Sequence, residues 1–107
     1  MDKIEKIIWT DDGIKSFEDI IQYISNDSTY YASEFAKRIV SSIENLPEFP
    51  YMGRIVPEYN KPDLREIIYQ NYRILYKIKG DAVYLILVIH GSRQLPEIEE
   101  SHRGNKK

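Results

Sequence analysis

Residues 72–93 carry the sequence YRILYKIKGDAVYLILVIHGSR, and the fold is decided in this stretch. Two β-prone runs, Tyr72–Lys79 and Ala82–His90, flank the dipeptide Gly80-Asp81. A two-residue loop that contains glycine between such runs predicts a tight β-hairpin. In such a hairpin residue 79 faces residue 82, and the pairing continues 78–83, 76–85, 74–87 and 72–89.

This register assigns each side chain of the hairpin to one face, because side chains alternate along a strand. The expected core face is apolar and carries Tyr72, Ile74, Tyr76, Ile78, Val83, Leu85, Leu87 and Ile89. The expected second face carries Arg73, Leu75, Lys77, Lys79, Tyr84, Ile86, Val88 and His90. Arg73 is then expected opposite Val88 and diagonal to His90, within reach of long side chains.

The remaining elements follow from periodicity and from turn residues. The run 4–9 predicts a first strand, and apolar spacings of three and four predict two helices, from Ile14 to about Asn26 and from Asp27-Ser28 to Pro47. The proline-rich segment 48–63 is expected to be a loop or extended connection, and 64–69 a strand that turns at 70–71 into the hairpin. The turn length at 70–71 is open, so the faces of Arg65 and Glu66 are open too.

The predicted order is therefore β-α-α-β-β-β, an α+β fold. An antiparallel sheet is packed on one face by an antiparallel helical hairpin, because the helices and the tyrosine face of the sheet both need apolar partners. We expect one domain over residues 1–95 and a polar tail at 96–107. The Arg73 face is then uncovered except by the tail, and Leu75, Tyr84, Ile86 and Val88 are expected to form a partly exposed partner surface.

The amino-acid composition limits the kinds of site and location that this protein can have. The chain has 107 residues and no cysteine, which excludes disulfides and thiolate metal sites. No signal peptide is visible, and the longest apolar run, at 82–89, is too short to cross a bilayer, so a cytoplasmic protein with no membrane partner is expected. No cofactor and no metal site is expected.

Charge is segregated along the chain, although the net charge is only −2. Residues 1–50 carry 5 basic and 10 acidic groups, whereas residues 51–80 carry 6 basic and 3 acidic groups. The basic segment fits a nucleic-acid contact. It fits equally well a sheet edge protected by lysine and arginine.

Three segments together resemble the RelE/ParE superfamily of type II toxin–antitoxin toxins. They are LPEFPYMGRIVPEY at 46–59, DLREIIYQNYRILYKI at 63–78 and VYLILVIHGSR at 83–93. The resemblance covers 4–95, is closer to the ParE-like, plasmid-stabilisation branch, and implies the β-α-α-β-β-β fold. It also implies a growth-inhibiting toxin that a cognate antitoxin neutralises.

The resemblance implies two alternative targets. ParE-type members bind and inhibit DNA gyrase, and RelE-type members cut mRNA on the ribosome, so whether the protein is an enzyme is open. A third alternative is a non-toxic relative that only binds an antitoxin. A homodimer and a toxin–antitoxin hetero-oligomer are both open.

The RelE-type alternative implies a catalytic set of Arg73 on the phosphate, His90 near a strand end and the carboxylate of Glu58. RNA cleavage through the 2′-hydroxyl needs a base, an acid and a cation. The target- or phosphate-binding candidates are Arg54, Arg65, Arg73 and Arg93.

Each candidate also has a structural interpretation. Arg73 can pair with a carboxylate such as Glu66 or one of the antitoxin, and His90 can be a hydrogen-bonded structural histidine. Tyr72 and Tyr76 are expected in the core with satisfied hydroxyls, and His102 is expected to be solvated. The net acidic chain weakens the RNA alternative, because phosphate-rich targets favour dense lysine and arginine.

Overall fold

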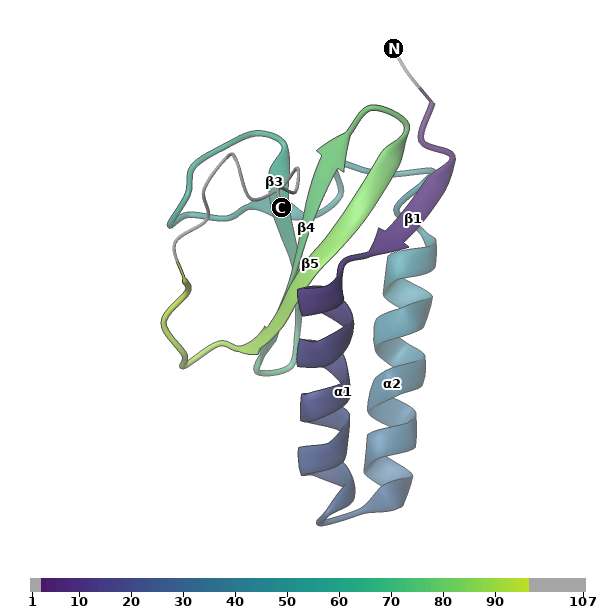
Figure 1. Ribbon diagram of the computed structural model, residues 1–107, viewed down its shortest axis with the longest axis vertical. Helices are drawn as coiled ribbons and strands as arrows, with labels where there is room; N and C mark the ends of the chain where they lie inside the picture. The colour runs from purple at the N-terminus through teal and green to yellow at the C-terminus, as the bar shows by residue number, and fades with distance from the viewer. Residues whose placement is uncertain (1–2, 97–107) are drawn as a thin grey trace.

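The computed structural model describes residues 3–96 and shows two helices beside a five-stranded sheet (Figure 1). Along the chain the elements are β1 (Lys6–Trp9), α1 (Asp11–Ser25), α2 (Thr29–Glu44), β2 (Arg54–Ile55), β3 (Leu64–Tyr69), β4 (Tyr72–Lys79) and β5 (Ala82–His90). The polar tail expected at 96–107 lies outside the described residues except for its first residue, and His102 lies outside them entirely.

The strand order is β1-β5-β4-β3-β2, and the helical hairpin packs on one face of the sheet. The predicted α+β arrangement is confirmed, with two additions. β1 runs parallel to β5, so the sheet is mixed rather than purely antiparallel. β2 is a two-residue strand within the expected connection, and it pairs with β3.

Both helices begin after a hydroxyl side chain that caps the first turn. Thr10 precedes α1, and its Oγ1 accepts a hydrogen bond of 2.9 Å from the amide of Gly13. Ser28 precedes α2, and its Oγ accepts one of 3.1 Å from the amide of Tyr31. Each hydroxyl satisfies an amide that lacks a partner within the first helical turn.

The β4–β5 hairpin follows the predicted register only near its turn. The pairs 79–82, 78–83 and 76–85 are confirmed, and Gly80 takes a positive φ of 60° in the turn. Beyond them a β-bulge interrupts the register, because Tyr76 pairs with Leu85 but Leu75 pairs with Leu87, and Ile86 is the extra residue between them. Ile74 therefore pairs with Val88 instead of residue 87. The predicted pairs 74–87 and 72–89 are therefore wrong.

The extra residue reverses the two faces in the second half of β5. Val88 and His90 lie on the helix-covered face, because they pair with Ile74 and Tyr72. Ile89 lies on the opposite face, because it pairs with Arg73. The expected pairing of Arg73 with Val88, and its shared face with His90, are wrong for this reason.

The start of α1 contacts the bulge through hydrogen bonds. Ser16 Oγ accepts a bond of 2.9 Å from the amide of Val88, and Thr10 donates from Oγ1 to the carbonyl of Leu85 at 2.9 Å. α1 approaches so closely that a Cβ on Gly13 would lie 2.2 Å from the Leu85 carbonyl oxygen. Glycine is thus required at position 13 by the close contact between helix and strand.

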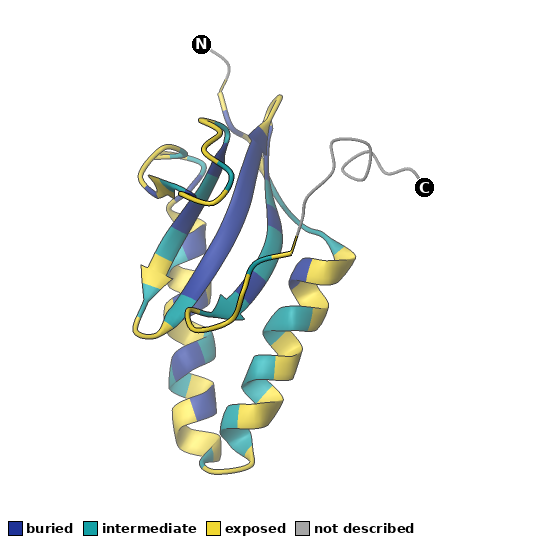
Figure 2. Ribbon diagram, turned by 90° about the vertical axis from the view of Figure 1, so that its left-hand side faces the viewer, coloured by how far each residue is buried: buried dark blue, intermediate teal, exposed yellow. Residues whose placement is uncertain are grey.

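Apolar side chains cover both faces of the sheet. The larger cluster lies between the sheet and the helices and includes Phe35, Ile39, Ile43, Leu46, Ile74, Tyr76, Val83, Leu85 and Val88. A smaller cluster on the Arg73 face contains Val56, Leu64 and Leu75, with Tyr59, Ile86, Leu87, Ile89 and Leu95 packed against it. The dark blue of β4 in Figure 2 reflects this two-sided burial.

The expectation of an uncovered Arg73 face is therefore wrong. Leu75 is fully buried, and Val88 is buried on the other face. The segment after β2 folds back over this face, and the Tyr59 hydroxyl donates a hydrogen bond to the carbonyl of Pro96. The proline-rich connection thus covers part of the surface that the sequence assigned to a partner.

Candidate functional site

Four charged side chains meet on the Arg73 face of the sheet. Arg73 on β4 donates from Nε to Glu66 Oε1 at 2.6 Å and from Nη2 to Glu66 Oε2 at 3.1 Å. The same guanidinium donates from Nη1 and Nη2 to the two oxygens of Glu58, both at 2.8 Å. Arg54 on β2 donates from Nε to Glu66 Oε2 at 2.6 Å. We call these four residues the ion network.

Strand pairing explains why these residues meet. The turn at 70–71 pairs Glu66 with Leu75 and Ile68 with Arg73, which places Glu66 on the Arg73 face. Arg54 pairs with Glu66 across β2 and β3. The open question about the face of Glu66 is thereby answered, and of the alternatives left open for Arg73 the structure shows the pairing with Glu66.

Burial differs strongly within the ion network. The Glu66 side chain has no exposed surface and that of Arg73 is 10% exposed, whereas Glu58 and Arg54 are about half exposed. Hydrogen bonds from Arg73 lower the pKa of Glu58 from 4.5 to about 2. The hydrogen bonds that Arg73 donates to Glu58 and Glu66 raise its own pKa above the usual range. Both groups stay ionised near neutral pH, each held by the other.

His90 lies apart from the ion network. Its ring packs edge-on against Tyr72, with 5.2 Å between ring centroids, and its Nδ1 accepts a bond of 3.1 Å from the Ser92 amide. Nδ1 also contacts Ser92 Oγ at 2.8 Å. Because the amide donates to Nδ1, the neutral ring carries its proton on Nε2. These contacts match the structural interpretation of His90.

The other two predicted arginines also lie away from the ion network. Arg65 faces the helix side, because it pairs with Tyr76. Its guanidinium donates to the carbonyls of Pro62 at 2.8 Å and Gly53 at 3.0 Å and stacks over the Tyr51 ring at 4.9 Å. Arg93 is exposed after β5 and lines a groove beside α1.

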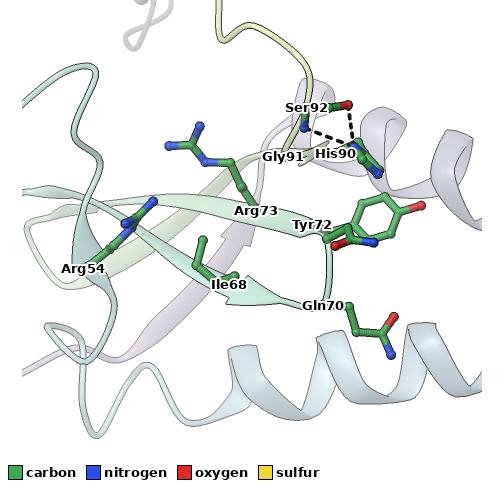
Figure 3. A pocket seen from close by; sticks show the side chains of 9 residues that line it. Arg54, Ile68, Gln70, Tyr72, Arg73, His90, Gly91 and Ser92 are labelled. Atoms are coloured by element: carbon green, nitrogen blue, oxygen red, sulfur yellow. Dashed lines mark hydrogen bonds between the residues drawn. The ribbon is translucent and has the colours of Figure 1, made fainter.

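A cavity of about 440 Å³ lies between the ion network and His90 (Figure 3). Its walls are formed by Arg54, Ile68, Gln70, Asn71, Tyr72, Arg73, His90, Gly91 and Ser92. The guanidinium groups of Arg54 and Arg73 lie on one side of this view, and His90 lies with Tyr72 on the other. Two of the three predicted catalytic residues, Arg73 and His90, line this cavity.

Two further polar side chains of β4 are buried, and only the contact made by Lys77 was not predicted from the sequence. Lys77 is nearly buried on the Arg73 face, and its Nζ contacts Asp63 Oδ2 at 3.0 Å. Tyr76 is fully buried, donates to the Pro50 carbonyl at 2.8 Å and accepts from the Gly53 amide at 3.0 Å. Burial raises the pKa of Tyr76. The prediction that its hydroxyl is satisfied in the core is confirmed.

Within residues 3–96, no three His, Cys, Asp or Glu side chains are grouped so that they could hold a metal ion. No helix in the same range has the length and apolar character to cross a membrane.

Comparison with known proteins finds matches whose descriptions refer to a toxin or to a toxin–antitoxin system. Residues 7–95 match the family model for the ParE toxin of the type II toxin–antitoxin system parDE. A relative from Sinorhizobium fredii (strain NBRC 101917 / NGR234), described as "Putative toxin Y4kP", is 30% identical over 88% of this chain and 96% of its own length. A solved structure, described as "Chromosomal ParDE TA system from P. aeruginosa", shares the fold with a TM-score of 0.65 at 15% identity, over 82% of this chain and 96% of that one. The family model spans most of the chain and agrees with the fold, and the chain therefore belongs to the ParE toxin family of type II toxin–antitoxin systems.

Proposed function

We propose that this chain is a toxin that inhibits DNA gyrase by binding it and that a cognate antitoxin neutralises it. The target comes from the ParE-type resemblance. The observation that favours binding over RNA cleavage is the ion network, in which the outer nitrogens of Arg73 are already bonded to Glu58. A phosphate would have to displace a carboxylate that forms two charge-assisted hydrogen bonds.

The acid–base chemistry points the same way. An efficient general base has a pKa near the working pH, and the pKa of Glu58 is lowered to about 2. His90 is the remaining candidate, and it packs on Tyr72 on the opposite face from Arg73. Arg73 and His90 line one cavity but extend from opposite faces of the sheet, and Glu58 is held by Arg73, which supports binding over RNA cleavage.

Growth and gyrase assays test this proposal. The chain is expressed alone in bacteria, and purified chain is added to a DNA supercoiling reaction with gyrase. We expect growth arrest, DNA breaks and loss of supercoiling, with cellular mRNA intact at the onset of arrest. Unaltered supercoiling by purified gyrase would refute the proposed target.

Two variants separate binding from cleavage. Glu58→Gln and His90→Ala alter side chains that are only partly buried, so both variants are expected to fold. We expect both to arrest growth like the unaltered chain. If either substitution restored growth and stopped ribosome-dependent mRNA cleavage, the chain would be a RelE-type nuclease. If the unaltered chain caused no arrest but bound its antitoxin, it would be a non-toxic relative.

A further inference from the structure

The helical hairpin extends beyond the sheet and leaves its tip free of the rest of the fold. In Figure 1 the turn between α1 and α2 lies at the bottom, well past the end of β5. Figure 2 shows mostly exposed and intermediate residues there. The tip comprises residues 23–31, which include the last turn of α1 and the first turn of α2.

Three tyrosines at the tip expose large aromatic surfaces. Tyr23, Tyr30 and Tyr31 are 73%, 67% and 66% exposed, and Tyr30 contacts Tyr31 edge-on at 5.5 Å between centroids. A shallow cavity of about 410 Å³ lies between the helix ends and is lined by Tyr23, Ile24, Asn26, Asp27, Ser28 and Tyr31. Grouped exposed aromatic residues of this kind are typical of binding surfaces, because a tyrosine offers both a contact face and a polar tip.

The surroundings of this cavity are acidic. From residue 16 to residue 36 the chain has four acidic side chains and no basic one. Asp19 and Glu34 have exposed lysine partners at 3.4 and 3.8 Å. Within residues 3–96, Glu18 and Asp27 form no ion pair, and Asp27 lines the cavity. An arriving cation would thus meet aromatic faces and an unpaired carboxylate together.

We propose that the hairpin tip is a docking surface for an arginine-containing basic segment of a partner protein. An arginine side chain enters between Tyr23 and Tyr31, stacks its guanidinium on a tyrosine ring and donates to the Asp27 carboxylate. Arginine fits better than lysine, because its guanidinium is planar, weakly hydrated and able to stack and donate at once. Nucleic acid is disfavoured, because its phosphates would face the carboxylates. This surface is independent of the proposed action on gyrase.

Peptide binding to the full chain tests the proposal. Fluorescein-labelled hexa-arginine is titrated with the chain, and its fluorescence anisotropy gives the dissociation constant. We expect Asp27→Asn and Tyr31→Ala each to raise that constant about fivefold. Hexa-lysine should bind more weakly than hexa-arginine. Circular dichroism confirms that each variant is folded.

Two matched variants provide the controls. Glu5→Gln removes the same charge as Asp27→Asn from an exposed position before β1, and Phe49→Ala removes an exposed aromatic ring beyond the other end of α2. Both should bind the peptide like the unaltered chain. Equal weakening by the controls would show attraction to any acidic surface and overturn the proposal. Gel filtration gives a second way to overturn the proposal. If the chain formed a dimer that Tyr31→Ala dissociates and hexa-arginine does not, a second copy of the chain would cover the tip.

Discussion

Arg73 and Glu66 form a buried ion pair that is costly to break. Glu66 has no exposed surface, and its two oxygens are held by Arg73 and Arg54. Removing one partner of a buried pair leaves an uncompensated charge, whereas replacing both partners with apolar groups is often neutral. The network therefore contributes to the stability of the fold.

The first prediction separates these effects. Arg73→Met should lower the free energy of unfolding by about 3 kcal/mol, because Glu66 then keeps only Arg54 as a cation. Adding Glu66→Leu should recover at least half of that loss, since the buried charge disappears. Urea denaturation of Arg73→Met, Glu66→Leu and the double variant measures this. Two losses that simply add would show that the pair is not coupled.

The second prediction concerns pH and Glu58. Its folded pKa of about 2 lies below its ordinary value of 4.5, so the unfolded chain binds this proton more readily. The stabilisation by Glu58 is therefore complete above about pH 5 and is lost as the pH falls toward 2. Glu58→Gln should cost ~0.5–1 kcal/mol at pH 7, since the pair is half exposed.

Denaturation of both proteins at a series of pH values measures this difference. The gap between the unaltered chain and Glu58→Gln should close progressively between pH 4.5 and pH 2. A gap that stays constant down to pH 2 would contradict the lowered pKa of Glu58.

At the scale of elements, the bulge of β5 determines which side chains share a face, and α1 contacts this bulge. The third prediction is that Ser16→Ala destabilises the fold by about 1–3 kcal/mol, because the amide of Val88 loses its partner. Ser42→Ala is the matched control. Within residues 3–96 its hydroxyl bonds only to the Arg38 carbonyl in α2, so little change is expected. Thermal unfolding compares the two, and an equal effect would contradict the role given to Ser16.

Except for the short strand β2, the elements could be predicted from the sequence, whereas the bulge could not. Helix caps at Thr10 and Ser28 and the glycine turn at residue 80 are local signals. β5 is apolar at almost every position, and the structure buries apolar side chains of it on both faces of the sheet. A slip of one residue then leaves the hydrophobic pattern intact, so alternation cannot reveal it.

In the candidate site, too, contacts set by local turns could be predicted and contacts that depend on the bulge or on a loop could not. Arg73 and Glu66 are close because a short turn joins β3 to β4, and their pairing could be predicted as one alternative. The place of His90 depended on the bulge, and the sequence therefore put it on the wrong face. Glu58 lies in a loop where no periodicity applies. Only the folded chain shows that its carboxylate holds Arg73.

On the scale of the whole molecule, stability is unevenly distributed. β4 has a neighbour on each side, and apolar clusters cover both of its faces. The tip of the helical hairpin has neither, because it extends past the sheet. Segments with few buried contacts open locally, whereas central strands exchange their amide protons only on global unfolding.

The fourth prediction follows from this difference. In native-state hydrogen exchange, the amides of β4 should be the slowest, and those of residues 23–31 should exchange at least about a hundredfold faster. Mass spectrometry of peptides from the exchanged chain measures both. Binding of a basic peptide at the tip should slow exchange there and leave β4 unchanged, because the ligand stabilises only the segment that it orders. Protection of the free tip equal to that of β4 would mean that the hairpin is held along its whole length, and the tip would then be part of the rigid core rather than an adaptable docking surface.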